Sequence, residues 1–92
     1  MKKINLPKIF KALASEKRLT ILKVLLKSKQ GLYPTLLSTK LNIPVETIER
    51  HLLKLRNIKV VNSKRYKNKM VYKIVIPNSV IKKLLLLLQK YF

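Results

Sequence analysis

The stretch LLSTKLNIPVETIERHLLKLRNIKVV, residues 36–61, decides how this chain folds. Apolar residues recur at helical spacing in two short segments, with Asn42-Ile43-Pro44 between them. The apolar positions are Leu36, Leu37 and Leu41 in the first segment and Ile48, Leu52 and Leu55 in the second. The connection is long enough only for a sharp corner. The stretch therefore predicts two short helices packed as a helix-turn-helix, whose second helix has the width of a DNA major groove.

The composition is typical of a small domain that binds polyanions. The 92 residues include 22 Lys and Arg against three Glu and no Asp, which gives a formal net charge of +19. Such a charge attracts nucleic acid or an anionic membrane surface and exceeds what solubility needs. Apolar residues make up 48% of the chain, which excludes a disordered basic tail. We expect one domain over residues 1–92, with a core small enough that a second subunit would stabilise it.

Several classes of protein do not fit this sequence. The chain has no cysteine, which excludes disulfides, zinc ribbons and thiolate metal sites, and its single glycine excludes a phosphate-binding glycine loop. The only carboxylate pair, Glu46 and Glu49, lies on a predicted convex helix, so we expect no enzyme, no cofactor and no metal. The longest apolar run, residues 84–88, is too short to span a bilayer, and Pro7 with Lys8 interrupts any signal-peptide core. We expect a cytoplasmic, nucleoid-associated protein.

Two further helices are expected before the helix-turn-helix. Pro7 is suited to the first turn of the first one. Ser15 is typical of an N-cap and predicts a second helix over about residues 16–28. Gly31, the only glycine, is expected to end this unit with a positive φ. Leu32-Tyr33 then predicts a very short strand before the third helix opens.

After the helix-turn-helix the apolar period changes from helical to alternating. Residues 60–64 and 70–76 are rich in β-branched and aromatic side chains and predict two strands. The connection at residues 65–69 is strongly basic, and Asn68 within it is expected to adopt a left-handed turn conformation. Tyr72 on the second strand is expected to face the core.

The expected order of elements is α-α-(β)-α-α-β-β-α, a mainly α fold with a small β-hairpin wing. Within this order, the sequences of three elements resemble those of ArsR-type winged helix-turn-helix regulators. The second helix in that family commonly begins with a small residue, an acid or Pro, and then Arg-Leu-x-Ile-Leu, and residues 12–22 (ALASEKRLTIL) are similar. Its recognition helix carries Ser/Thr-Val-Ser-x-His-Leu-x-x-Leu-Arg, which residues 47–56 (TIERHLLKLR) resemble, and its wing ends in a strand like residues 70–74 (MVYKI). The resemblance covers about residues 9–76 and implies a dimeric, DNA-binding transcription regulator.

The chain departs from the family pattern at three points. Metal-sensing members carry paired cysteines at the start of the third helix, where residues 33–38 here are YPTLLS, so the resemblance implies a positive regulator or constitutive repressor without metal sensing. The common turn glycine is replaced by Asn42, which tolerates a left-handed conformation. Position 45, often a polar base reader, is Val45, which offers only an apolar contact to a thymine methyl.

Three groups of residues are expected to face DNA. They are Val45, Glu46, Thr47, Glu49, Arg50, His51 and Lys54 of the recognition helix (about residues 45–56), Lys64, Arg65, Lys67 and Lys69 of the wing, and Thr35, Ser38 and Lys40 of the third helix. Thr47 and Arg50 are expected to be exposed and to reach base edges. Glu46 is interpreted first as an N-terminal helix charge that pairs with Arg50, and alternatively as an acceptor from cytosine. His51 either packs or contacts a phosphate.

Dimerisation is expected through the two ends of the chain. The last helix, residues 78–92, is apolar on more than one face, so it either covers its own core or meets a second copy. The expected dimer-interface residues are Ile4, Leu6, Phe10, Ile81, Leu84, Leu85, Leu88 and Tyr91. A twofold dimer would place two recognition helices ~34 Å apart on a pseudo-palindromic site.

Two functions of different kinds remain open at this point. One is a sequence-specific regulator that binds double-stranded DNA as a homodimer; the alternative is a non-specific architectural protein that coats DNA by neutralising phosphates. An RNA-binding module is disfavoured because no exposed aromatic residues are expected on a sheet face, and a membrane-surface module because basic residues occur on every helix. The Lys-, Ile- and Asn-rich usage indicates an AT-rich genome, archaeal or viral.

Overall fold

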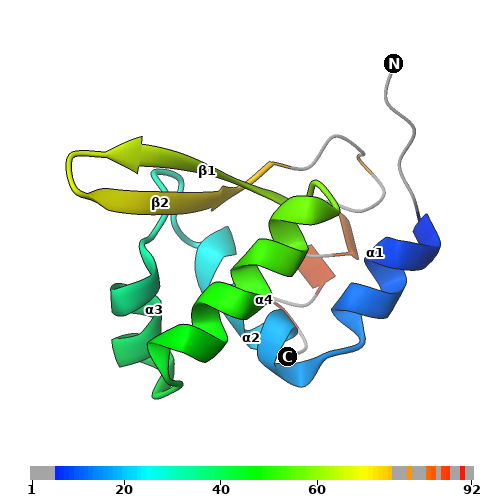
Figure 1. The fold of residues 1–92 in the computed structure, drawn as a ribbon. Coiled ribbons are helices and arrows are strands. Elements are labelled where there is room, and N and C mark those ends of the chain that lie inside the picture. Colours follow the sequence, from blue (N-terminus) through cyan, green and yellow to red (C-terminus); the bar gives the residue numbers. More distant parts are fainter. Residues whose placement is uncertain (1–5, 76–78, 80–82, 85, 88–89, 91–92) are drawn as a thin grey trace.

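The computed structural model describes residues 6–75, 79, 83–84, 86–87 and 90. The elements are α1 (Leu6–Leu13), α2 (Glu16–Leu26), α3 (Pro34–Leu41), α4 (Val45–Asn57), β1 (Val61–Tyr66) and β2 (Lys69–Ile74). α3 adjoins the N-terminal end of α4, and the β1–β2 hairpin follows from its C-terminal end (Figure 1). The described positions beyond residue 78 are helical as well. The expected mainly α fold with a hairpin wing is confirmed.

The helix ends are fixed by the residues that the sequence suggested. Ser15 is extended and its Oγ accepts a hydrogen bond from the Arg18 backbone N–H at 3.3 Å, so it caps α2. Pro34 occupies the first turn of α3, where its missing N–H costs no helical hydrogen bond. Asn42 ends α3 with φ 56°, and its N–H donates to the Ser38 carbonyl. The left-handed Asn42 expected in the turn is confirmed.

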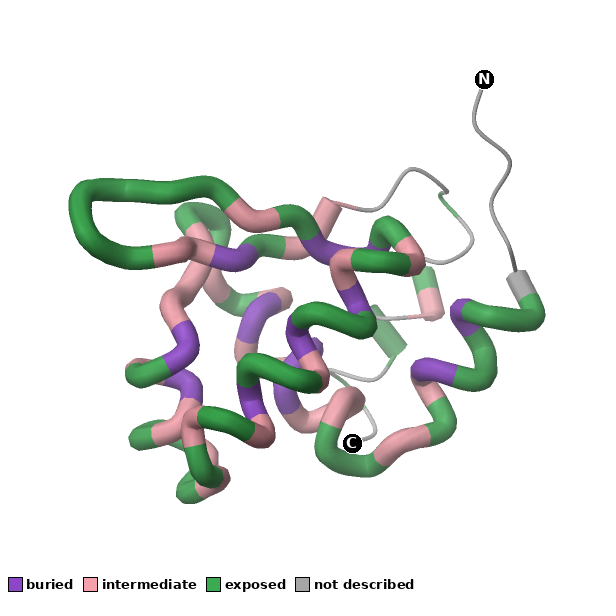
Figure 2. Tube along the Cα trace, viewed as in Figure 1, coloured by how far each residue is buried: buried purple, intermediate pink, exposed green. Residues whose placement is uncertain are grey.

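The core lies where α2, α3 and α4 meet the base of the hairpin. Ile48, Leu52 and Leu55 of α4 have no exposed surface, and buried stretches of the neighbouring elements surround them (Figure 2). On α2 the helical spacing predicts that Leu19 faces the core. In the structure Leu19 is only half-buried, and Ile21 is fully buried. Burying an apolar side chain of this size contributes roughly 1.5–3 kcal/mol. α4 therefore has a firmly buried inner face.

Gly31, the only glycine of the chain, lets a third segment pair with the small sheet. β1 and β2 pair in antiparallel register, and Leu32 adds a bridge to Tyr72 through backbone hydrogen bonds of 2.8 Å in both directions. Gly31 has φ 91°, and a Cβ there would lie 2.7 Å from the Tyr72 carbonyl oxygen and from a methyl of Val71. The chain can approach β2 this closely only because residue 31 has no side chain. The positive φ and the very short strand are both confirmed.

The hairpin extends further than the sequence predicted. The pairs Arg65↔Met70 and Tyr66↔Lys69 continue the ladder, so only two residues form the turn and not the five of residues 65–69. Within that turn Lys67 has φ 56°, and Asn68 is not left-handed, so the expectation for Asn68 was wrong. A two-residue hairpin loop with positive φ at its first central position matches the right-handed twist of the strands, and this geometry sets the conformation.

Part of the expected dimer interface lies outside the described residues. This holds for Ile4, Ile81, Leu85, Leu88 and Tyr91, and for the side chain of Leu6. Of the others, Phe10 on α1 is 51% exposed, and Leu84 is half-buried against the core. Along the described part of the chain, no helix has the length and apolar character that crossing a membrane requires.

Candidate nucleic-acid interface

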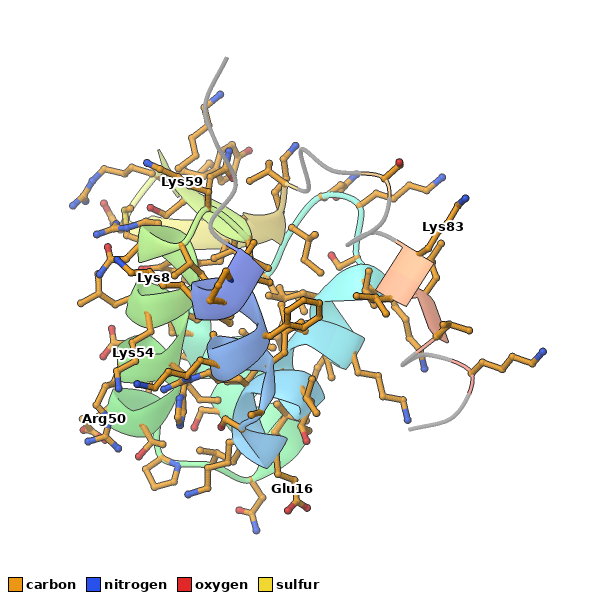
Figure 3. All side chains as sticks on the ribbon, turned by 90° about the vertical axis from the view of Figure 1, so that its right-hand side faces the viewer. Lys8, Glu16, Arg50, Lys54, Lys59 and Lys83 are labelled. Atoms are coloured by element: carbon orange, nitrogen blue, oxygen red, sulfur yellow. The ribbon has the colours of Figure 1, made fainter. Side chains whose placement is uncertain are left out.

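The outer face of α4 is a ridge of exposed side chains opposite its buried stripe. Glu46, Arg50, Leu53 and Asn57 follow one another at intervals of three or four residues and are all exposed. Lys54 is exposed beside them, and Arg50 and Lys54 project outward at the same edge of the molecule (Figure 3). We call these five residues the α4 ridge. Because the opposite face is locked into the core, the ridge has a fixed orientation.

Two predicted contact residues lie at the flanks of α4 and not on its outer face. Thr47 was expected to be exposed, but it is half-buried, and so is Val45. Helical spacing explains this, since Thr47 lies about 100° around the axis from buried Ile48 and therefore borders the packed face. Arg50, by contrast, is exposed as expected.

Both glutamates of α4 face solvent. Among the residues described by the structure, no ion pair joins Glu46 to Arg50, so the expected pairing was wrong. Glu46 still lies in the first turn of α4, where the helix dipole stabilises a negative charge. Glu49 is also exposed. The surface of α4 thus carries two carboxylates next to its basic residues.

His51 takes part in packing between α4 and α2. Its Nδ1 accepts a hydrogen bond from Nε of Arg18 at 3.1 Å, and the Arg18 guanidinium also donates to the Ala12 carbonyl at 3.4 Å. Burial lowers the pKa of His51 below its ordinary value, and the nearby charges of Arg18, Arg50, Lys17 and Lys54 lower it further. A neutral His51 is required for it to accept this hydrogen bond. Of the two expected roles, the structure shows the packing one.

The wing side chains divide between the two faces of the hairpin. Residues Ser63, Arg65, Met70 and Tyr72 share the face that carries the core residues, as the register requires. Arg56 of α4 donates from Nη1 to Ser63 Oγ at 3.0 Å on this face, a contact between helix and wing that sequence reasoning missed. Arg65 is exposed and shares the Ser63 face.

The predicted wing lysines occupy the opposite face and the turn. Lys64 and Lys69 point to the side away from the core, and Lys67 lies in the turn between the strands. Lys69 Nζ lies 4.0 Å from the centre of the Tyr33 ring. All three lysines are exposed. The four basic wing residues therefore do not form one cluster.

The third-helix residues have unequal access to solvent. Thr35 and Lys40 are exposed, while the Ser38 hydroxyl donates to the Ile43 carbonyl at 2.6 Å. That hydrogen bond closes the corner between α3 and α4, so the Ser38 side chain has a structural role in the turn. The Ser38 hydroxyl can reach the Ile43 carbonyl because left-handed Asn42 turns the chain so that Ile43 lies back over α3.

Sequence reasoning missed one exposed apolar residue, Leu53, and wrongly excluded an exposed aromatic residue on the sheet, Tyr66. Leu53 is 44% exposed on the α4 ridge, and its position outside the Ile48–Leu52–Leu55 stripe could have indicated this. Tyr66 is 65% exposed and lies on the outward face of the sheet with Lys64. The expectation that no exposed aromatic residue lies on a sheet face was therefore wrong. The cause is the longer hairpin, which places Tyr66 inside β1 and not in the connecting loop.

Comparison with solved structures relates this geometry to known proteins. The chain matches HlyU of Vibrio cholerae with 29% identity and a TM-score of 0.81, over 100% of this chain and 98% of that one. It matches the transcriptional repressor PagR of Bacillus anthracis with 29% identity and a TM-score of 0.76, over 89% and 90% of the two chains. A further match is a possible ArsR-family transcriptional regulator of Mycobacterium bovis, whose winged helix-turn-helix DNA-binding domain is homodimeric, with 24% identity, a TM-score of 0.77 and coverage of 92% and 75%.

The resemblance to ArsR-type winged helix-turn-helix regulators is confirmed by these matches. The sequence matches no family model and no curated protein. The structural neighbours are transcriptional regulators and not enzymes, in agreement with the sequence-based prediction. Over the described residues, no three His, Cys, Asp or Glu side chains gather where they could hold a metal ion. The absence of a metal and the archaeal or viral source stay predictions.

Proposed function

We propose that this protein is a transcription regulator that binds a specific site on double-stranded DNA as a homodimer. The observation that carries the proposal is the α4 ridge: exposed Arg50 and Lys54 on a helix whose opposite face is fully buried. A helix held in this way can enter the major groove with a constant orientation, which base reading needs. The solved regulators and repressors that share the fold support the same use of it.

Base reading in this proposal depends mainly on Arg50. Its guanidinium is free of any carboxylate partner in the described part of the chain and can donate two hydrogen bonds to a guanine. Leu53 adds an apolar surface suited to a thymine methyl, the contact that Val45 was expected to make. Lys54 and the wing residues Lys64, Arg65, Lys67 and Lys69, together with Thr35 and Lys40 of α3, supply contacts to phosphates that position the protein without reading sequence.

The homodimer in this proposal uses the C-terminal segment, residues 78–92. Leu86 and Leu87 are 47% and 50% exposed, and adjacent large apolar residues at a surface indicate a covered face. Leu84 packs on its own core, so it is a poor site for a test. We expect Leu87→Lys to give a folded monomer in analytical ultracentrifugation, with Lys83→Ala as a neighbouring control. A Leu87→Lys variant that sediments as a dimer would contradict this part of the proposal.

The competing function is a DNA-coating architectural protein. It is favoured by the net charge of +19, which can neutralise phosphates without reading sequence, and by the small number of base-reading groups on α4, where Glu46 and Glu49 occupy part of the exposed face. Nuclease footprinting on genomic DNA of the source organism separates the two functions. We expect a discrete protected inverted repeat. Continuous protection without a preferred site would overturn the regulator and favour the architectural protein.

A further inference from the structure

The outward face of the small sheet forms a basic groove with two aromatic rings. The groove has a volume of about 1030 Å³, and its lining includes Lys64, Lys67, Lys69, Lys73, Tyr33 and Tyr66. It lies on the side of the hairpin away from the core, because the register places Lys64, Tyr66, Lys69 and Lys73 on that side. We call this surface the outer sheet face. It is separate from the α4 ridge.

We propose that the outer sheet face binds a single strand of nucleic acid, with bases stacked on the tyrosines and phosphates held by the lysines. Basic grooves with aromatic side chains are the usual means by which proteins bind single strands, because every base presents a flat face to stack on. A sheet with exposed aromatic side chains is a common platform of this kind.

The positions of the two tyrosines support stacking. Tyr66 on β1 pairs across the strands with Lys69 on β2, and Lys69 Nζ lies 4.0 Å above the Tyr33 ring. The rings therefore flank Lys69 from the segments on either side of β2, and neighbouring strands lie about 4.8 Å apart in a sheet. Lys67 Nζ lies 5.5 Å from the Tyr66 ring. Each ring thus has an ammonium group over one face, and a base that stacks on that face takes the place of the ammonium, which can then contact the adjacent phosphate.

The charge of this face is not balanced by acids. The three Glu of the chain, Glu16, Glu46 and Glu49, belong to α2 and α4 and do not line the groove. Asn62 also lines it and can donate a hydrogen bond to a base edge. The groove therefore presents cations, neutral polar groups and aromatic surface to a polyanion.

A single strand fits this surface better than a duplex does. In a duplex the base faces are stacked on one another, so an exposed ring can meet only sugar and phosphate. Tyr66 is 65% exposed and has no packing role in the core. A large exposed aromatic side chain among lysines gains most from an unstacked base.

Binding of a fluorescent oligodeoxyuridylate, and of an oligouridylate of equal length, tests the proposal at one fixed salt concentration. We expect Tyr66→Leu to weaken binding by roughly 5- to 150-fold, the range typical of removing a stacking side chain. Tyr66→Phe, which keeps the aromatic ring, is the matched control and should bind like the wild type. A dependence on the ring with either oligonucleotide supports the site, and the oligonucleotide that binds tighter identifies the preferred sugar.

A second pair of variants separates this site from duplex binding. Lys73→Gln should weaken the single strand and leave duplex affinity unchanged, because Lys73 lines the groove but pairs with Asn62 at the end of the hairpin away from the turn, outside the wing residues proposed to contact duplex phosphates. Arg50→Ala should do the reverse. Equal single-strand affinity for wild type, Tyr66→Leu and Lys73→Gln would overturn the proposal and leave only general attraction to a basic protein. Circular dichroism confirms that the exposed substitutions leave the fold intact.

Discussion

α4 and the β1–β2 hairpin both carry basic residues, but the fold holds them in different ways. α4 is anchored by Ile48, Leu52 and Leu55, which have no exposed surface. The hairpin is anchored on one face, by residues such as Tyr72 and Met70, while every residue from 64 to 69 is exposed. Base reading needs side chains held in one place, while phosphate contacts tolerate variation in position. We therefore propose that the helix reads the sequence and that the wing supplies general affinity.

The largest effect is expected on stability, when a buried residue that anchors α4 is shortened. Leu52→Ala leaves a cavity in the core and should lower the free energy of unfolding by about 2–5 kcal/mol in urea denaturation. The neighbouring Leu53 is 44% exposed, so Leu53→Ala is a matched control with an expected change of about 0.5 kcal/mol or less. Similar losses for the two variants would contradict the described orientation of α4.

The next effect concerns the wing and its binding to phosphates. Arg65→Ala should reduce the salt dependence of duplex binding, with the slope of log affinity against log salt falling by about 0.9 for each phosphate that the Arg65 side chain neutralises. The reduction should be the same for every DNA sequence. Lys11 is exposed on α1, which lies on the opposite side of the molecule from the hairpin turn (Figure 1), so Lys11→Ala serves as the control. An unchanged slope for Arg65→Ala would remove this residue from the interface.

A smaller effect on stability is expected when the pH is lowered, and it depends on His51 of α4. Burial and neighbouring cations lower the pKa of His51 in the folded protein, so the unfolded chain takes up a proton first as the pH falls below about 6.5. Stability should therefore be constant above that pH and decrease as the pH falls toward the lowered pKa. Thermal unfolding across this range should show a smaller decrease for His51→Gln, which does not titrate. The same decrease in both proteins would exclude His51 as the cause.

The helices could be predicted closely because their signals are local. Ser15, Pro34 and Asn42 mark helix ends through their own backbone chemistry, and the α4 stripe follows from residue spacing. The hairpin could not be placed as well, since its length depends on cross-strand pairs such as Tyr66↔Lys69. One consequence was that the exposed tyrosine on the sheet went unnoticed. Partners distant in sequence, such as Arg18 and His51, gave no local signal either.

The predicted contact residues show the same contrast between local signals and contacts that depend on the folded structure. Exposure of Arg50, Lys54 and Lys40 follows from helical spacing and could be expected. The use of Ser38 in the corner depends on where Ile43 returns, with its carbonyl oxygen 2.6 Å from the Ser38 hydroxyl, which only the folded structure determines. Spacing therefore predicts which side chains face outward but not which of them are already occupied.

The most direct test of the division between helix and wing is the ratio of affinities for operator and random duplex DNA. This ratio is measured at one salt concentration for the wild type, Arg50→Ala and Arg65→Ala. We expect Arg50→Ala to reduce the ratio by a factor corresponding to about 1–3 kcal/mol, because alanine cannot donate the two hydrogen bonds to guanine. Arg65→Ala should weaken both DNAs and leave the ratio unchanged. A ratio that is unaffected by Arg50→Ala, or abolished by Arg65→Ala, would contradict this account.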